Sequence, residues 1–262
     1  MAKTPFFTII TASLNSSASI QRTLESINGQ TFKNLEHIVA DGASTDETVD
    51  ILKAFKNTYN LTWLSEPDRG IADALNKALM NAKGKYVLVL QADDHLIDMT
   101  VLERVYHLLK NEKNDVYSFP VFKNYLDSKK ILLKPIRVKW WNHFKFIFCH
   151  QGTFVHKRLY EKVGNFRTDY SIVIDYDFFY RALKEKPVIA FGNFPVAEMA
   201  GYGISSRKET ITERLKEEAL VQTKNETTIF WKFSQTVFRL LYVPYKTRLL
   251  PMFKKINSRN SD

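Results

Sequence analysis

The strongest constraint on the fold is a regular alternation of strand-like and helix-like segments through the first half of the chain. Four short apolar runs, rich in β-branched and aromatic residues, predict strands at Phe6–Ala12, Leu35–Asp41, Leu61–Ser65 and Tyr86–Gln91. Strand–helix–strand units of this length are joined by right-handed crossovers and build a mostly parallel sheet. The sequence therefore predicts a doubly wound α/β domain, with helices flanking the sheet.

The segments between these strands carry apolar residues at helical spacing. Three faces follow this pattern: Ile20, Leu24 and Ile27; Val49, Leu52 and Phe55; and Ile71, Leu75, Ala78 and Leu79. Ser44 and Glu47 predict a capping box that opens the second helix. Further along the chain, strands are expected at Val116–Phe122, Ile131–Lys134 and Val188–Phe191, and helices at Arg158–Val163 and Tyr176–Lys184.

Composition sets the cellular setting that we expect. The 262 residues contain a single cysteine, Cys149, which cannot form an internal disulfide and favours a reducing compartment. The N-terminus shows no signal-peptide pattern, and no apolar run reaches the length of a membrane span. We therefore expect a cytoplasmic protein.

The net charge of +10 admits either nucleic acid or an anionic membrane surface as a partner. Residues 229–256 carry much of the excess, because they contain six Lys or Arg residues and no Asp or Glu. Phe230, Phe233, Val237, Leu240 and Leu241 fall on one face of a predicted helix in this segment. Such a basic amphipathic helix can lie on an anionic membrane. Equally, it can pack on its own domain with its lysines in water.

Polar residues follow each of the first four predicted strands. Ligands of open α/β sheets bind in the crevice beyond the carboxyl ends of the strands. The four endings are Thr11 to Asn15, Asp41 to Ser44, Glu66 to Gly70, and Ala92 to Asp94. Any one of them is explained as a turn or a helix cap, but four endings on one edge favour a binding site.

Carboxylates gathered at one edge favour a bound cation. Two like charges 4 Å apart repel by about 4 kcal/mol at an effective dielectric constant of 20. Mg²⁺ and Mn²⁺ are commonly held by one or two carboxylates together with substrate phosphates, and Asp93 and Asp94 suit that role. The chain has no Gly-x-x-x-x-Gly-Lys-Ser/Thr loop and no Gly-x-Gly-x-x-Gly after the first strand, which excludes a P-loop and argues against a dinucleotide site.

These residues belong to an ordered series of longer motifs. The series is Ile-Ile-Thr-Ala-Ser-Leu-Asn at 9–15, Asp-Gly-Ala-Ser-Thr-Asp at 41–46, Glu-Pro-Asp-Arg-Gly-Ile-Ala-Asp-Ala-Leu-Asn-Lys at 66–77, Gly-Lys-Tyr-Val-Leu-Val-Leu-Gln-Ala-Asp-Asp at 84–94, His-Gln-Gly at 150–152 and Ile-Asp-Tyr-Asp-Phe-Phe-Tyr-Arg at 174–181. In this series the chain resembles glycosyltransferase family 2, whose members are inverting enzymes with the GT-A fold. The resemblance covers roughly Phe6 to Ser206.

The resemblance implies roles on the sugar-donor side. Asp41 would bind uracil or another base, and Thr11, Ser13 and Asn15 would frame the nucleotide pocket. The nucleotide-sugar side would be lined by Asp68, Gly70, Asp73 and Asn76. It also implies a donor half at about 1–115 and an acceptor half at about 116–206 within a domain spanning 1–206. Residues 207–262 are expected as a basic helical extension.

The resemblance also implies the metal and the base. Asp93 and Asp94 match the Asp-x-Asp-type motif, with Asp94 as the expected Mn²⁺ or Mg²⁺ ligand and Asp93 as a second ligand or a sugar contact. Asp175 matches the aspartate that serves as catalytic base. His150 and Gln151 stand where related sequences place a sugar-donor or acceptor contact.

Three departures from the family pattern bear on these roles. Ala12 replaces a common proline, and Gln91 stands where many members carry another acid. Ile174 replaces a common glutamate, which leaves the choice of base open between Asp175 and Asp177. Both acids also have a simpler interpretation, because the first turn of a helix favours negative charge.

The expected activity is transfer of one sugar from a nucleotide-diphosphate sugar, UDP-linked, to a hydroxyl, with inversion. The acceptor would be a glycan or a polyprenyl-diphosphate-linked intermediate of bacterial surface-polysaccharide synthesis, reached from the inner face of the cell membrane. The chain lacks the Gln-x-x-Arg-Trp motif of processive synthases, which favours one sugar per encounter.

Three alternatives stay open. A sugar-phosphate nucleotidyltransferase shares the fold plan but calls for a glycine-rich basic loop after the first strand, which residues 13–19 lack. A nucleic-acid-binding protein would place exposed aromatics among basic residues, but acids at the strand ends repel phosphates, so we expect no nucleic acid. The third alternative is a degenerate transferase that binds its ligand without catalysing transfer.

Overall fold

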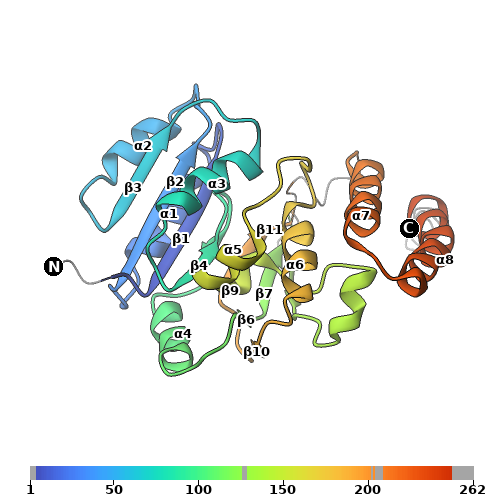
Figure 1. The fold of residues 1–262 in the computed structure, drawn as a ribbon. Coiled ribbons are helices and arrows are strands. Elements are labelled where there is room, and N and C mark those ends of the chain that lie inside the picture. The colour runs from blue at the N-terminus through green and yellow to red at the C-terminus, as the bar shows by residue number, and fades with distance from the viewer. Residues whose placement is uncertain (1–3, 126–128, 202, 204–208, 250–262) are drawn as a thin grey trace, which may run out of the picture.

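The computed structural model describes residues 4–125, 129–201, 203 and 209–249 (Figure 1). Its centre is a seven-stranded sheet in the order β10-β6-β9-β4-β1-β2-β3. The strands are β1 (Phe7–Ser13), β2 (Leu35–Asp41), β3 (Leu61–Ser65), β4 (Tyr86–Val89), β6 (Val116–Ser118), β9 (Thr153–His156) and β10 (Ile189–Phe191). Only β9 runs antiparallel to its neighbours, β4 and β6, and the other pairings are parallel. The predicted mostly parallel sheet is confirmed.

Helices cover both faces of the sheet, and β1 shows why. Phe7 and Ile9 face one apolar core while Ile10 faces the other, so the strand is buried on both sides. The helices are α1 (Ile20–Asn28), α2 (Thr48–Ala54), α3 (Ile71–Asn81), α4 (Val101–Leu109), α5 (Lys157–Val163), α6 (Ile174–Lys184), α7 (Ile211–Asn225) and α8 (Ile229–Pro244). Short helical turns add η1 (Lys139–His143), η2 (His150–Gly152) and η4 (Tyr245–Leu249). The predicted flanking helices are confirmed.

A second, smaller sheet has the order β5-β11-β7-β8. Its strands are β5 (His95–Leu96), β7 (Val121–Asn124), β8 (Lys130–Leu133) and β11 (Ala197–Ala200). The predicted single strand Val116–Phe122 is therefore wrong, since it divides into β6 and β7 in different sheets. The reason lies at Pro120, which has no N–H for a ladder hydrogen bond. Strands β7 and β8 pair antiparallel, and Asp127 and Ser128 between them lie outside the described residues.

The predicted capping box at Ser44 is also wrong. Helix α2 begins at Thr48, and the Ser44 hydroxyl and amide both donate to the carboxylate of Asp41. At the helix start the acceptor is Asp46, whose Oδ1 accepts from the backbone amide of Thr48 at 3.0 Å. The carboxylate at the end of β2 binds Ser44, so this serine does not cap the helix.

The C-terminal helices pack at the end of the molecule opposite α2 and β3 (Figure 1). Helix α7 contacts α6, and α8 contacts α7. Within the part of the chain that the structure describes, no helix combines the length and apolarity needed to cross a bilayer. Within the predicted extension 207–262 the structure describes α7, α8 and η4, of which α7 packs on α6, and α8 on His143 and Phe144.

A buried histidine joins the central strands. His37 on β2 is fully buried, with Nε2 2.9 Å from the Thr11 hydroxyl and Nδ1 2.8 Å from the Tyr59 hydroxyl. The Thr11 hydroxyl donates its only proton to the carbonyl of Leu90 at 2.6 Å. Nε2 of His37 must therefore carry a proton, and Nδ1 accepts from Tyr59. Burial lowers the pKa of His37 to about 3.

This histidine predicts a pH-dependent stability. The unfolded chain binds a proton at His37 below its ordinary pKa of 6.5, whereas the folded chain does not until pH falls to about 3. Stability is therefore lost as pH falls below 6.5. Between pH 7 and pH 5, His37 should lower the free energy of unfolding by about 2 kcal/mol. Urea unfolding of the wild type and His37→Gln at both pH values measures it. Equal losses in the two proteins would contradict the prediction.

Candidate active site

Three neighbouring strands end together at one edge of the sheet. The register pairs Ser13 of β1 with Asp41 of β2, and Asp41 with Ser65 of β3. Asp41 is 1% exposed, and its Oδ2 accepts from the Ser44 amide at 2.9 Å and the Ser65 hydroxyl at 2.6 Å. The buried Ser13 hydroxyl has no hydrogen-bond partner among the described residues. Asp41 and Ser13 thus lie buried side by side at the ends of neighbouring strands, where the nucleotide site was expected.

Sequence reasoning missed Ser65 and misassigned Ser44. Both serines hold the carboxylate of Asp41 in place. The position of Ser65, at the end of the strand that neighbours Asp41, is the signal that could have identified it. Ser44 lies three residues after Asp41, a spacing at which a carboxylate can accept hydrogen bonds from the following hydroxyl and amide.

Three residues predicted to line the nucleotide site are engaged in structural contacts. The Thr11 hydroxyl is buried and already bonded to His37 and to the Leu90 carbonyl. Asn15 accepts from the Thr45 amide at 2.9 Å, which ties the loop after β1 to the loop after β2. Asn76 donates to the Phe166 carbonyl at 2.8 Å and accepts from its amide at 3.0 Å. These three side chains hold the loops around the crevice.

The loop between β3 and α3 places Asp68 over the end of β2. A Cβ atom at Gly42 would lie 2.5 Å from Oδ2 of Asp68, so only glycine allows this close approach. Oδ1 of Asp68 accepts from the amide of Gly70, whose φ of 112° favours glycine. Asp73 lies in the first turn of α3, where a hydrogen bond from Arg69 lowers its pKa. Asp41 and Asp68 therefore share one region, while Asp73 is engaged by Arg69.

The strand-end acids Asp93 and Asp94 differ in burial. Asp93 is exposed, whereas Asp94 is 2% exposed and accepts hydrogen bonds from the Gln91 amide and the Gln151 side chain. Burial raises the pKa of Asp94 to about 7, and the charge of Asp93 adds to the shift. Gln151 reaches Asp94 because η2 leads into β9, the antiparallel neighbour of β4.

The second half of the site comes from η2 and the start of α6. Nδ1 of His150 lies 3.0 Å from Oδ2 of Asp175, and both side chains are partly exposed. Burial alone lowers the pKa of His150, but the hydrogen bond and charge of Asp175, with the charges of Asp94 and Asp93, raise it overall. Nε2 of His150 is buried and without a hydrogen-bond partner among the described residues. Asp94, Gln151, His150 and Asp175 thus form one continuous polar cluster.

Asp177 occupies a different environment from Asp175. It is completely buried, its Oδ1 lies 3.1 Å from the Arg167 guanidinium, and its Oδ2 lies 2.9 Å from that of Arg181. The amide of Asn225 donates to it at 3.0 Å. Each carboxylate oxygen is paired, and none is open to the crevice. The geometry assigns Asp177 to the interface between α6 and α7.

The residues around Asp94 fit a divalent cation. Within the described ranges no group of three or more Asp, Glu, His or Cys side chains is arranged to hold a metal. Two neighbouring carboxylates, such as Asp93 and Asp94, suit an ion whose remaining ligands are phosphate oxygens and water. A buried carboxyl with a raised pKa beside a second acid is the environment that a cation stabilises.

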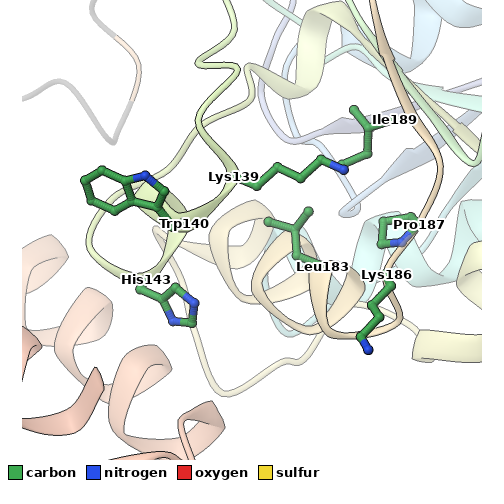
Figure 2. A pocket seen from close by; sticks show the side chains of 7 residues that line it. All are labelled: Lys139, Trp140, His143, Leu183, Lys186, Pro187 and Ile189. Carbon is green, nitrogen blue, oxygen red and sulfur yellow. The ribbon is translucent and has the colours of Figure 1, made fainter. Parts of the chain in front are cut away.

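The aromatic segment before His150 contributes mainly to the core. Phe144 and Phe148 are buried, whereas Trp140 is 53% exposed. Trp140 lines a pocket at the carboxyl end of α6, together with Lys139, His143, Leu183, Lys186, Pro187 and Ile189 (Figure 2). Asp175 lies at the opposite end of the same helix, so this pocket is separate from the polar cluster.

The comparisons with known proteins identify the family. Residues 8–164 match Glycosyl transferase family 2. A PGL/p-HBAD biosynthesis glycosyltransferase of Mycobacterium tuberculosis is 30% identical over 195 residues, covering 71% of this chain and 72% of the relative. The chain therefore belongs to glycosyltransferase family 2.

Two further proteins extend the comparison. The Escherichia coli UDP-Glc:alpha-D-GlcNAc-diphosphoundecaprenol beta-1,3-glucosyltransferase WfaP is 34% identical over 125 residues, covering 48% of each chain. The mannosyltransferase PcManGT from Pyrobaculum calidifontis, solved with GDP-Man and Mn²⁺, has a TM-score of 0.67 and 19% identity over 94% of this chain and 73% of its own. The structural similarity to PcManGT establishes that the two proteins share a fold.

The environments of the two acids predict effects on stability that differ in size. Asp177→Ala removes one partner of a buried ion-pair cluster and should lower the free energy of unfolding by roughly 3–5 kcal/mol. Asp175→Ala, at a partly exposed position, should change it by less than about 1 kcal/mol. Chemical denaturation of both variants measures the difference, and a larger loss at Asp175 would contradict the assignment.

Proposed function

We propose that this enzyme transfers one sugar from a nucleotide-diphosphate sugar, UDP-linked, to a hydroxyl group, with inversion at the anomeric carbon. The acceptor is a polyprenyl-diphosphate-linked or oligosaccharide intermediate of cell-surface polysaccharide synthesis. The observation that carries the proposal is the cluster of Asp94, Gln151, His150 and Asp175 beyond the end of β4. This cluster supports a base at Asp175 close to a diphosphate site at Asp94.

The chemistry follows from these positions. Asp175 accepts the proton of the acceptor hydroxyl as that oxygen attacks the anomeric carbon, and the nucleoside diphosphate leaves on the opposite side. His150, bonded to Asp175 through Nδ1, orients the carboxylate. A Mn²⁺ or Mg²⁺ ion bound at Asp93 and Asp94 would supply Lewis-acid stabilisation of the departing diphosphate. Attack opposite the leaving group inverts the anomeric centre.

On the sugar-donor side, Asp41 and Ser13 would receive the nucleoside, with Asp68 and Gly70 beside the nucleotide sugar. Asp41 is already oriented by Ser44 and Ser65, so little reorganisation accompanies binding. The division into a donor half at about 1–115 and an acceptor half at about 116–206 stays a prediction.

The relatives support the choice of substrates. The name of WfaP states a UDP-glucose donor and a diphosphoundecaprenol-linked acceptor, and PcManGT was solved with GDP-Man and Mn²⁺. A diphosphate-linked sugar donor is common to both. Because WfaP shares 48% of its length with this chain, the donor sugar and the acceptor of this enzyme are parts of the proposal.

A panel of UDP-glucose, UDP-GlcNAc and GDP-mannose, each with Mn²⁺ or Mg²⁺, tests the reaction against a synthetic GlcNAc-diphosphate lipid. We expect Asp94→Ala to lose the metal dependence of both turnover and thermal stabilisation by UDP. Asp175→Asn should keep that stabilisation and lose transfer by about 100-fold to 10,000-fold, the typical contribution of a general base. An active Asp175→Asn would overturn the role of the base, and stabilisation by UDP without turnover in the wild type would indicate a protein that only binds.

We also propose that residues 229–256 attach the enzyme to an anionic membrane surface, which a lipid-linked acceptor makes useful. Helix α8 has two apolar faces. Its inner face packs on the domain, with Trp231 stacked on His143 at 4.1 Å and Phe238 5.0 Å from Phe144. The outer face points to solvent, with exposed fractions of 65% for Phe230, 69% for Phe233, 69% for Leu240 and 71% for Leu241.

Charge favours a lipid surface as the occupant of this outer face. The helix carries Lys232 and Arg239 and no acidic residue, and residues 245–256 add four more cations. An apolar stripe with a basic border matches the interface of an anionic bilayer, where acyl chains lie beneath phosphate groups. The enzyme would then act as a peripheral protein at the inner face of the membrane.

Substitution of the outer face tests this attachment. Sedimentation with phosphatidylglycerol vesicles should show binding of the wild type and a loss of more than about 100-fold in Phe233→Ser/Leu240→Ser/Leu241→Ser, because each buried side chain contributes roughly 1.5–3 kcal/mol. Met80→Ser is the matched control, since Met80 is 71% exposed on α3. Equal binding of the triple variant would end the proposal, and a changed oligomeric state would point to a second copy of the chain.

A further inference from the structure

Helix α6, which carries the candidate base, begins without a capping side chain of its own. Its N-cap residue is Val173, which cannot accept a hydrogen bond through its side chain. The first amide groups of an α-helix have no partner within the helix, and buried amides left unpaired are strongly disfavoured. The start of α6 therefore needs an acceptor from another part of the chain.

Glu217 of α7 accepts from the residues that lead into α6, of which the last is the N-cap Val173. Its Oε1 accepts from the amide of Ser171 at 2.9 Å and from the Ser171 hydroxyl at 2.8 Å. Its Oε2 accepts from the amides of Ile172 at 2.9 Å and Val173 at 3.1 Å. The residue is 6% exposed. Three successive backbone amides and one hydroxyl thus converge on a single carboxylate, which has enough lone-pair sites to accept all four.

These hydrogen bonds hold the segment 171–173 that leads into α6, and Asp175 follows two residues after Val173. Asp175 is fixed on one side by His150, at 3.0 Å, and on the other by the amide of Tyr176 at 2.8 Å, which belongs to the same helix. A displacement of the segment 171–173 moves the Asp175 carboxylate relative to His150. The contacts of Asp177 with Arg167 and Arg181 hold the next turn of α6, so the effect of Glu217 falls on the start of the helix.

We infer that Glu217 is a positioning residue for sugar transfer, which holds the Asp175 carboxylate in line with the acceptor hydroxyl. The inference rests on the proposed function, because it assumes that Asp175 is the base. Glu217 lies outside the segment 8–164 that matches the family. Its neighbours on α7 act elsewhere: Glu213 pairs with Lys216, and Glu218 pairs with Lys145 and Arg214.

Glu217→Gln tests the inference at nearly constant size. The glutamine oxygen still accepts, but its amide nitrogen faces two of the four donors and displaces the segment. We expect kcat for transfer to the GlcNAc-diphosphate lipid to fall by up to about 100-fold, the effect of a misplacement of about 1 Å. The Kd for UDP with Mn²⁺, measured by calorimetry, should stay unchanged. Glu213→Gln makes the same chemical change at an exposed position of α7 and should match the wild type.

Glu217→Asp keeps the charge on a shorter side chain, and it should recover part of kcat. A purely structural role would lower the melting temperature and the folded fraction, while kcat per folded molecule and its ratio to UDP affinity stay at wild-type values. That result overturns the inference. Asp175→Asn is measured alongside: if it is inactive while Glu217→Gln has normal kcat, the positioning role alone fails. If Asp175→Asn is fully active, both the base and the positioning role fail.

Discussion

The candidate chemistry depends on a sheet in which neighbouring strands run in the same direction and end at one edge. The register of β1, β2 and β3 aligns Ser13, Asp41 and Ser65 there. Strand β9 runs the other way, so its beginning, with His150 and Gln151, meets the end of β4. One antiparallel strand within a parallel sheet thus brings residues from distant parts of the sequence beside Asp94.

Acids gathered in this way must be stabilised, and the means differ from one acid to the next. Hydroxyl and amide groups surround Asp41, a guanidinium pairs with Asp73, and an imidazole pairs with Asp175. Asp94 instead lies buried beside Asp93, and its pKa rises to about 7. The crevice therefore contains one acid whose charge the surrounding protein leaves poorly compensated. This contrast is the physical argument for a cation at Asp94.

Much of the fold could be predicted from the sequence, because strand and helix periodicities are local properties. The strand-end positions of Asp41 and Asp94 followed from the same pattern. Contacts between side chains on different strands could not be predicted: Thr11 was expected to face the nucleotide, yet its hydroxyl serves His37 and the Leu90 carbonyl. The sequence favoured Asp175 as the base but left the choice between Asp175 and Asp177 open. Their difference depends on Arg167, Arg181 and Asn225, which only the folded chain brings together.

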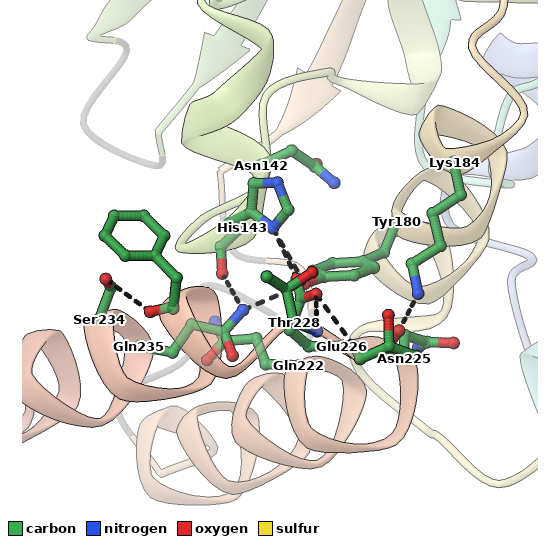
Figure 3. Close-up of polar contacts among 12 residues, drawn as sticks. Asn142, His143, Tyr180, Lys184, Gln222, Asn225, Glu226, Thr228, Ser234 and Gln235 are labelled. Carbon is green, nitrogen blue, oxygen red and sulfur yellow. Dashed lines mark hydrogen bonds and ion pairs between the residues drawn. The ribbon is translucent and has the colours of Figure 1, made fainter.

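The helices after residue 209 contact α6 along its whole length. Glu217 accepts from the residues that lead into it, and Asn225 donates to Asp177 in its first turn. The Tyr180 hydroxyl in its second half donates to Glu226 and accepts from Gln235 (Figure 3). Gln235 belongs to α8, whose outer face is exposed. The helix that carries the candidate base is thus held by the same C-terminal segment that we propose to contact the membrane.

The match to the family ends at residue 164, before α6 begins. A hybrid enzyme joined at residue 164 would take α1 to α5 from one parent and α6 onward from another. Such a junction would keep Asp177 and the segment 171–173 with α7. The sugar-donor side, built by α1 to α5, and the candidate base would then come from different parents. A junction between α6 and α7 would disturb the start of α6 more. An α7 from another parent would need an acceptor for the four donors of residues 171–173 and a partner for the buried Asp177–Arg167 pair. The workable unit for exchange is α6 and α7 together.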